Sequence, residues 1–305
     1  MYMQVSIVIP NYNGKELLQR NLPQVINSAS NSEIIVVDDG STDGSSTFLK
    51  QHFPKIKLIE KVTNSGFSTT VNLGVKAAQN AVVVLLNTDV VPQTDFIPGL
   101  LKSFRDPQIF AVGFIDLSQE GVETVKRGRG IGKFSRGLFV HARGNVNNSN
   151  TLWASGGSSA FRKRIWEDLG GLDELYDPFY WEDIDLSYRA LKKGYQILFN
   201  ADIVVRHAHE EGSINKLYSK NEIQTIAYRN QFIFIWKNIT DRKFILQHTL
   251  WMPIHLMKAL VKGDFCMIKG FLWALSMYAS IMRHRNLHNL NVVLTDPELL
   301  KKYDE

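Results

Sequence analysis

The stretch VVDDGSTDGS, residues 36–45, runs from an apolar segment into two adjacent carboxylates, Asp38 and Asp39, and then into a turn of Gly, Ser and Thr. Adjacent acids repel each other, and a polar group close to a core is costly unless something binds it. The apolar part belongs to EIIVVD (33–38), which we interpret as a strand because most of its residues are apolar. The two acids therefore mark the carboxyl end of a predicted strand.

The first 115 residues alternate such apolar runs with amphipathic stretches. The further runs that predict strands are VSIVIP (5–10), IKLIE (56–60), AVVVLLN (81–87) and FAVGF (110–114), and the stretches that predict helices are 15–29, 43–52, 67–80 and 94–104. This alternation indicates a mostly parallel α/β sheet flanked by helices. Ligands bind at the carboxyl ends of the strands in such sheets, so we expect Asp38 and Asp39 to lie at a ligand site.

The rest of the chain falls into three parts. Residues 116–150 are rich in Gly, Asn and basic side chains and are interpreted as long loops. The part that follows predicts helices near 162–169 and 182–193, with a strand at 195–199 or 202–206. From about 218 the pattern is helical and strongly apolar. We therefore expect an α/β domain over 1–217, with halves of about 1–115 and 150–217, and an amphipathic helical region over 218–305.

Composition describes an ordinary globular chain. Of 305 residues, 44% are apolar and 21% are charged, which is not the composition of a disordered protein. The single cysteine, Cys266, excludes an internal disulfide and fits a reducing compartment. No basic region or small-residue cleavage site precedes VSIVIP, so we predict no signal peptide and a cytoplasmic location.

The net charge of +5 is concentrated near the C-terminus, because residues 218–295 hold ten Lys and Arg against three Asp and Glu. Such an excess favours an anionic partner, either a membrane or a nucleic acid. The longest uncharged stretches here, 244–257 and 270–282, are shorter than the ~18 residues of a spanning helix. Lysines interrupt the apolar surface and Trp and Phe flank it, as in helices that lie in a membrane interface. We expect peripheral attachment to the inner face of the cell membrane and no nucleic acid; packing on the chain's own domain or in a homodimer is the alternative.

A second acidic site follows another predicted strand, in VVVLLNTDV, where Asp89 lies at the tip. One such acid could simply cap the next helix. Two sites 50 residues apart in one α/β unit would meet at one edge of the sheet. There the carboxylates could hold a divalent cation and the hydroxyls of a ribose.

A third acidic group lies in WEDIDLSYRALKKG, residues 181–194. As a helix this segment pairs Asp185 with Arg189 at i and i+4 and places Glu182 and Asp183 in the first turn. Acids in a first turn also stabilise a helix without any catalysis. The preceding LYDPFYW supplies an aromatic wall suited to a sugar ring.

In order along the chain, VSIVIPNYNG, VVDDGSTDGS, NSGFSTTVNLGVKAA and LLNTDVV resemble the N-terminal half of family 2 glycosyltransferases, which have the Rossmann-like GT-A fold. The segment ASGGSSAFRKRIWEDLGGLDELYDPFYWEDIDLSYRALKKGYQILF resembles the acceptor half of these enzymes. The segment RNQFIFIWKN resembles the helical tail of the rhamnosyltransferase-like branch. The resemblance does not cover residues 125–145 or the end after 285.

The resemblance implies roles for particular residues. Asp38 and Asp39 would hold the nucleobase and ribose of a nucleotide sugar, and Asp183 would be the catalytic base, supported by Glu182. The metal-binding DXD motif reads Asn87-Thr88-Asp89 here, so one carboxylate remains for Mg²⁺ or Mn²⁺. The other residues implied are Pro10 and Tyr12 for the base pocket, Asn64 and Asn72 for the nucleotide, and Trp153, Gly156, Gly157 and Trp181 for the acceptor. Relatives often carry a metal-binding His before a Gly-Ser pair, which favours His209, with His207 nearly equal.

Together these features predict a metal-assisted inverting glycosyltransferase that uses a dTDP- or UDP-linked donor and a glycan or lipid-linked acceptor. One alternative is a non-catalytic protein that binds nucleotide sugars on the same fold. Another is a sugar-phosphate nucleotidyltransferase, but its glycine-rich basic signature is reduced here to Gly14 and Lys15.

The segment GRGIGKF (128–134) is not a P-loop, because its spacing is one residue short and Phe134 replaces the Ser or Thr that meets Mg²⁺. The basic residues of this region either close over a phosphate or lie on a solvated loop; they are Lys126, Arg127, Arg129, Lys133 and Arg136.

Overall fold

The structure, a computed structural model, describes residues 4–29, 31–93, 95–120, 123–208, 212–288 and 291–304. The strands are β1 (Val5–Asn11), β2 (Glu33–Asp38), β3 (Lys57–Glu60), β4 (Val82–Leu86), β5 (Val90–Pro92), β6 (Ile109–Glu120), β7 (Glu123–Arg127), β8 (Gly130–Ser135), β9 (Leu138–Arg143), β10 (Ser158–Arg162) and β11 (Gln196–His207). The helices are α1 (Lys15–Ser28), α2 (Ser45–His52), α3 (Phe67–Ala77), α4 (Ile97–Ser103), α5 (Lys163–Asp168), η1 (Glu174–Tyr176), α6 (Glu182–Lys192), α7 (Ser213–Leu217), α8 (Lys220–Asn238), α9 (Arg242–Lys262), α10 (Phe265–Ser276), α11 (Tyr278–His288) and α12 (Asp296–Leu300).

The predicted α/β sheet is present, and it is mixed. Its strand order is β3-β2-β1-β4-β10-β6-β11-β5, and β7 pairs with β6. Strands β3, β2, β1 and β4 are mutually parallel, whereas β10 runs antiparallel to both β4 and β6. The strands predicted in the first half are therefore confirmed, and both segments proposed near 195–206 belong to the single strand β11.

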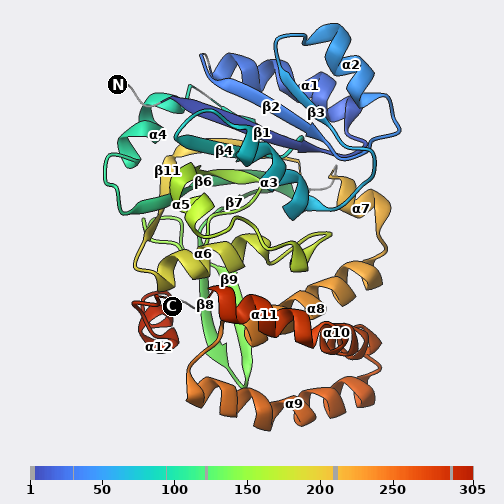
Figure 1. Cartoon of the computed structure of the whole chain (residues 1–305), viewed down its shortest axis with the longest axis vertical. Helices are drawn as coiled ribbons and strands as arrows, with labels where there is room; N and C mark the ends of the chain where they lie inside the picture. The colour runs from blue at the N-terminus through green and yellow to red at the C-terminus, as the bar shows by residue number, and fades with distance from the viewer. Residues whose placement is uncertain are drawn as a thin grey trace.

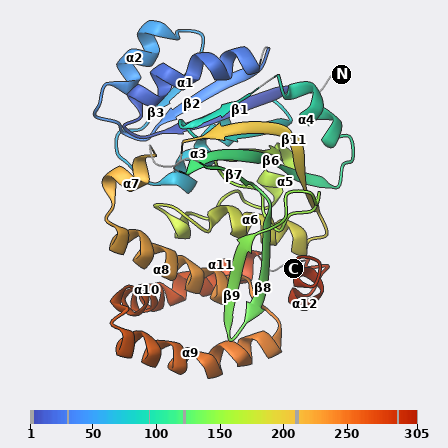
Figure 2. The same ribbon diagram turned by 180° about the vertical axis from the view of Figure 1, so that it is seen from behind.

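Helices cover both faces of this sheet (Figures 1 and 2). One apolar cluster packs α1, α2 and α4 against one face, through residues such as Leu18, Leu49 and Leu100. A second cluster packs α3, α5 and α6 against the other face and continues into the C-terminal helices. Burial on both faces explains why the strands are apolar throughout rather than alternating. It also leaves the carboxyl edge of β1, β2 and β4 as the place for polar side chains.

The prediction of long loops over 116–150 is wrong. Strand β6 continues to Glu120 and pairs with β7, and β8 forms a hairpin with β9, in register from Gly130 opposite Arg143 to Ser135 opposite Leu138. The turn of this hairpin consists of Arg136 and Gly137, at φ 49° and 75°. Two residues with positive φ are the requirement of the common two-residue hairpin turn. The many Gly and basic residues of this segment led to its interpretation as loops, although it forms strands.

The five basic residues of this region do not form one cluster around a phosphate. Lys126 and Arg127 lie on β7, and Lys133 pairs with Asp304. Arg129 is buried and donates to both the carbonyl and the side-chain oxygen of Asn150. None of the five lines the cleft described below.

The C-terminal helices lie at the end of the molecule opposite α1 and α2 (Figures 1 and 2). Helix α8 begins with a capping box between Ser219 and Glu222 and buries Phe232, Ile233 and Phe234. In the described residues, no single helix is long and apolar enough to cross a membrane. The pair α10 and α11 passes that test only when taken together, and it is bent by 68°.

Candidate active site

A cleft of about 340 Å³ lies at the carboxyl ends of β1, β2 and β4. Residues far apart in the sequence meet there, from the strand ends, the segment 155–157 and the start of α6. The predicted site residues that line it are Pro10, Tyr12, Asp39, Asn64, Asn87, Asp89, Gly156, Gly157, Glu182, Asp183 and His207. Four acids of the sequence analysis, Asp39, Asp89, Glu182 and Asp183, therefore share one cavity.

The turn after β2 explains the first acidic pair. Asp39 lines the cleft and accepts from the amide nitrogens of Ser65 (3.0 Å) and Gly66 (3.1 Å) and from Lys61 Nζ (2.6 Å). These contacts hold the segment that carries Asn64 against the turn. Gly40, at φ 74°, allows this approach, because a Cβ there would lie 2.9 Å from the backbone of Thr63.

Asp38 is buried beneath the cleft and does not line it. Its carboxylate accepts from Asn11 Nδ2 (2.7 Å) and from the amide nitrogen of Ser41 (2.9 Å). Asn11 is the last residue of β1, and Ser41 belongs to the turn after β2. Asp38 therefore joins the end of β1 to the turn that carries Asp39.

Asp89 follows β4 and faces His207 at the end of β11, with 3.3 Å between Oδ1 and Nε2. The other ring nitrogen of His207 lies 2.7 Å from Oδ2 of Asp116, a buried residue of β6. Burial alone would lower the pKa of His207, but its hydrogen bonds to Asp116 and Asp89 raise that pKa to about 9. Asp116 thereby orients the ring so that Nε2 is directed at Asp89.

These two side chains can fit a divalent cation. The Asp89 carboxylate and the His207 ring would leave positions open for oxygens of a ligand, once the cation displaces the proton that the raised pKa keeps on the ring. A carboxylate on the second ring nitrogen is the usual support for a metal-binding histidine. His209, the first choice of the sequence analysis, lies outside the described residues.

Glu182 and Asp183 are the first two residues of α6 and also line the cleft. Asp183 accepts from the amide nitrogens of Gly156 (3.1 Å) and Ile184 (2.8 Å). Glu182 is buried, and its Oε2 has no hydrogen-bond partner among the described residues. Burial raises the pKa of both carboxyl groups, and the neighbouring Asp183 charge raises that of Glu182 further. Two adjacent acids that hold their protons more tightly than usual are suited to proton transfer.

The backbone that leads to these acids is strained. Tyr180 and Trp181 have φ of 71° and 77°, a region that residues other than Gly rarely adopt. Asn230 of α8 is fully buried and directs Nδ2 at three carbonyls of this segment, those of Tyr176 (3.0 Å), Phe179 (2.9 Å) and Tyr180 (2.8 Å). Strained backbone persists only where its surroundings fix it, so α8 sets the position of the acids.

Arg229 adds to this anchoring. Its Nη2 donates to the carbonyls of Tyr176 (3.1 Å) and Asp177 (2.6 Å), and its guanidinium lies 4.3 Å from the ring centre of Trp273. Burial lowers the pKa of Arg229 to about 10. The resemblance of RNQFIFIWKN to a helical tail gave no indication that its first two residues, Arg229 and Asn230, anchor the loop that precedes Glu182 and Asp183.

Of the implied residues that the structure describes, four lie outside the cleft lining: Asp38, Asn72, Trp153 and Trp181. Asn72 exchanges hydrogen bonds with the backbone of Leu172 (2.8 and 2.9 Å), so it joins α3 to the segment before α6. Trp181 is 6% exposed and packs on Phe139 and Phe234. Trp153 packs on His141 of β9.

The cleft also contains aromatic residues that the sequence analysis did not name individually as site residues. Phe67, Phe179, Tyr180 and Tyr218 supply its aromatic surface, and Tyr180 is 42% exposed. Tyr180 belongs to the aromatic wall of the sequence, in which Trp181 had been preferred. Trp181 immediately precedes α6, and its ring packs in the core. The ring of the preceding residue, Tyr180, lines the cavity.

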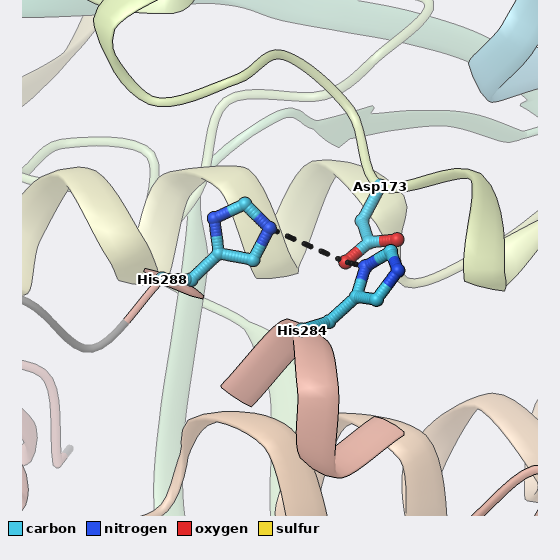
Figure 3. Close-up of side chains that lie close together, drawn as sticks. All are labelled: Asp173, His284 and His288. Atoms are coloured by element: carbon cyan, nitrogen blue, oxygen red, sulfur yellow. Dashed lines mark hydrogen bonds and ion pairs between the residues drawn. The ribbon is translucent and has the colours of Figure 1, made fainter. Parts of the chain in front are cut away.

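A second group of metal-type ligands lies outside the cleft lining. Ligand atoms of Asp173, His284 and His288 lie within 4.8 Å of one another (Figure 3). However, Lys237 Nζ lies 2.5 Å from the same Asp173 oxygen that His284 contacts at 3.0 Å. Burial and the nearby Arg189 and Lys237 charges lower the pKa of His288 to about 4. The carboxylate is thus already paired with a cation, and we assign this group to the ion network that joins α11 to α6.

Solved structures with a similar fold support the architecture. GalNAc-T7 with UDP, GalNAc and Mn²⁺ is 17% identical, with a TM-score of 0.61 over 77% of this chain and 48% of that one. The mannosyltransferase PcManGT from Pyrobaculum calidifontis, in complex with GDP-Man and Mn²⁺, is 14% identical, with a TM-score of 0.58 over 95% of this chain and 88% of that one. The fold is therefore GT-A, as predicted.

The family model described as Glycosyl transferase family 2 matches residues 6–170, which is more than half of the chain, and the chain belongs to this family. Among curated proteins, the O-antigen chain rhamnosyltransferase RfbN of Salmonella typhimurium is 26% identical over 68% of this chain and 67% of its own length. The dolichol-phosphate mannosyltransferase of Pyrococcus furiosus is 32% identical over 36% of this chain and 33% of its own length. The chain thus spans between a third and two thirds of these relatives.

Proposed function

We propose that this protein is an inverting glycosyltransferase that moves a hexosyl or rhamnosyl group from a nucleoside-diphosphate sugar to a hydroxyl of a glycan or lipid-linked acceptor. The observation that carries the proposal is that one cleft is lined both by Asp39, Asp89 and His207, from the ends of β2, β4 and β11, and by Glu182 and Asp183 at the start of α6. We call the first group with its neighbours the donor side and the second group the acceptor side. The name of RfbN and the structures with UDP and GDP-Man support this class of donor and acceptor.

On the donor side, Asp39 and Asn64 would hold the nucleoside, and Pro10 and Tyr12 would contact the base. Asp38 would hold the turn that carries Asp39. Asp89 and His207 would hold Mg²⁺ or Mn²⁺, which when bound neutralises charge on the departing diphosphate. Asn87 and Gly157 line the cleft between this side and α6, and the amide nitrogen of Asn87 donates to the carbonyl of Gly157 (3.0 Å).

On the acceptor side, Asp183 would take the proton of the attacking hydroxyl. The amide nitrogens of Gly156 and Ile184 orient its carboxylate, and its raised pKa favours uptake of that proton. Tyr180 offers an exposed ring on which a sugar could stack, the role that the resemblance gave to Trp153 and Trp181. A single displacement of this kind inverts the anomeric carbon.

For the cellular setting, we propose that the protein is cytoplasmic and attaches to the inner face of the membrane through residues 218–295. The basic excess of that segment supports this attachment. A lipid-linked acceptor would be presented at the same surface.

Thermal unfolding with a panel of nucleoside diphosphates and nucleotide sugars, with and without Mn²⁺, tests the donor. A ligand at about 100 times its dissociation constant adds ~2.7 kcal/mol of stability. We expect a metal-dependent rise with at least one UDP- or dTDP-linked compound. No rise with any compound would overturn the donor class.

The Asp89→Ala variant tests the metal ligand. The variant should fold normally and lose the Mn²⁺ dependence of nucleoside-diphosphate binding, because its main carboxylate ligand is gone. Asp202→Ala, at an exposed acid of β11 outside the cleft lining, is the matched control and should keep that dependence. Titration calorimetry with and without Mn²⁺ decides; an unchanged metal dependence in Asp89→Ala would remove Asp89 from the site.

A further inference from the structure

Helix α9 presents an apolar face that no described element covers. The side chains of Leu246, Leu250, Ile254, Met257 and Val261 recur every three or four residues, and their exposed fractions run from 44% to 80%. This spacing places them in one stripe along the helix. The opposite side of α9 buries His248, Met252 and Ala259. We call the exposed stripe, with its flanking residues, the outer face of α9.

Cations are placed at both ends of the outer face. Arg242 and Lys243 lie in the first turn, Lys258 and Lys262 lie near the end, and α9 contains no Asp or Glu. All four cations are exposed. Within α9 the charged side chains near the apolar stripe are therefore all positive, while the acids next to the helix, Asp241 and Asp264, cap the starts of α9 and α10.

The β8–β9 hairpin brings a fifth cation to this helix. His248 Nδ1 lies 2.6 Å from the carbonyl oxygen of Gly137, and His255 Nε2 lies 2.7 Å from that of Arg136. The exposed guanidinium of Arg136 lies 5.8 Å from the ring centre of Trp251. The hairpin tip thus adds positive charge beside α9, and α9 forms the end of the molecule farthest from α1 and α2 (Figures 1 and 2).

We propose that the outer face of α9 lies on an anionic lipid surface, with the helix in the plane of that surface. Apolar side chains enter the boundary between head groups and acyl chains, while cations at both ends meet the anionic head groups. Charge complementarity selects this occupant over a second copy of the chain. In a twofold contact the same face meets itself, which would place four cations against four cations.

This inference deepens the membrane attachment of the proposed function by naming the surface that binds. Flotation with vesicles needs neither donor nor acceptor, so its failure leaves the transfer reaction untouched. The probes are vesicles of phosphatidylcholine alone and of phosphatidylcholine mixed with phosphatidylglycerol. We expect the wild-type chain to float with the anionic vesicles only, and to be released as salt rises.

Two double variants identify the face. Leu250→Asp/Met257→Asp should weaken vesicle binding on the order of 100-fold, because two large apolar side chains no longer enter the lipid. Lys258→Gln/Lys262→Gln should weaken it about 30-fold, since each cation near an anionic surface contributes about a fivefold change. The control Val62→Asp/Val293→Asp introduces the same two negative charges at exposed valines outside α9. Its affinity for the anionic vesicles should fall by less than tenfold relative to the wild type.

Three results would overturn the proposal. The wild-type chain could fail to float with either vesicle at low salt. The Leu250→Asp/Met257→Asp variant could bind as tightly as the wild type, which would place attachment elsewhere. Light scattering could show a wild-type dimer that this variant converts to a monomer, which would assign the outer face to a second copy. Thermal unfolding is the check that each variant is folded, and the exposure of the changed residues makes loss of folding unexpected.

Discussion

On one side of the cleft, the Asp39 carboxylate accepts hydrogen bonds from two backbone amides and pairs with Lys61, while Asp38 beneath it is held by Asn11 and Ser41. On the other side, Glu182 keeps an oxygen without a partner among the described residues. The donor-side carboxylates are held by hydrogen bonds and an ion pair, whereas burial raises the pKa of both acceptor-side acids. This difference supports the proposal that the donor side binds and the acceptor side reacts.

The largest effect is expected from Asp183→Asn. This change keeps the shape of the side chain but removes its ability to accept the proton of the acceptor hydroxyl. Transfer should slow on the order of 10²–10⁴-fold, the usual contribution of a general base. Radiolabelled sugar transfer under saturating donor measures it. A rate close to wild type would exclude Asp183 as the base and leave Glu182 as the candidate.

A smaller effect on the same side is expected from Asn230→Leu. Without its three hydrogen bonds, the strained segment before α6 can relax and displace Asp183. A displacement of about 1 Å can cost on the order of 10²-fold, so we expect kcat to fall 10- to 100-fold with little change in donor affinity.

Gln231→Leu is the matched control for that variant. It removes a side-chain amide from the same helix, but that amide donates to the carbonyl of Phe139 in the hairpin rather than to the base loop. If both variants lower kcat equally, Asn230 supports the general fold and is not a positioning residue.

The smallest effect concerns stability. The pKa of Glu182 is raised well above 4.5 in the folded protein by burial and by Asp183, so unfolding releases a proton at any pH between 4.5 and that folded pKa. This cost is absent below pH 4.5 and grows as pH rises towards the folded pKa. Glu182→Gln should therefore raise Tm on the order of 2–4 °C at pH 8 and by less at pH 4. A variant that is less stable than wild type at pH 8 would show that the carboxyl group is not isolated as described.

The donor side and the helix of acids could be predicted from the sequence because both rest on local patterns. Asp39 and Asp89 each follow a parallel strand, and the carboxyl ends of parallel strands lie at the same edge of the sheet. Helix α6 was predicted from the i, i+4 spacing of Asp185 and Arg189. The partners of these groups could not be predicted. Asp116 lies within a 12-residue strand with no neighbouring signal, and Asn230 is reached only through tertiary packing.

The β8–β9 hairpin and the aromatic residues show a second limit. The turn of the hairpin, Arg136-Gly137, lies in a segment with several other glycines. The two strands on either side of this turn were therefore interpreted as a loop. Which of Tyr180 and Trp181 faces the cleft depends on two left-handed residues, and no periodicity reports such a backbone. The sequence therefore predicted the acids that line the cleft better than it predicted the aromatic residues that line it.

The division of labour between the two sides is tested most directly by titrating UDP, dTDP and GDP, each with Mn²⁺, into the wild type, Asp39→Asn and Asp183→Asn. For the diphosphate that binds the wild type best, Asp39→Asn should weaken binding on the order of 10- to 100-fold, because a charged acceptor of hydrogen bonds is lost. Asp183→Asn should bind like the wild type. Equal weakening in both variants, or weakening in Asp183→Asn alone, would contradict a donor side that binds and an acceptor side that reacts.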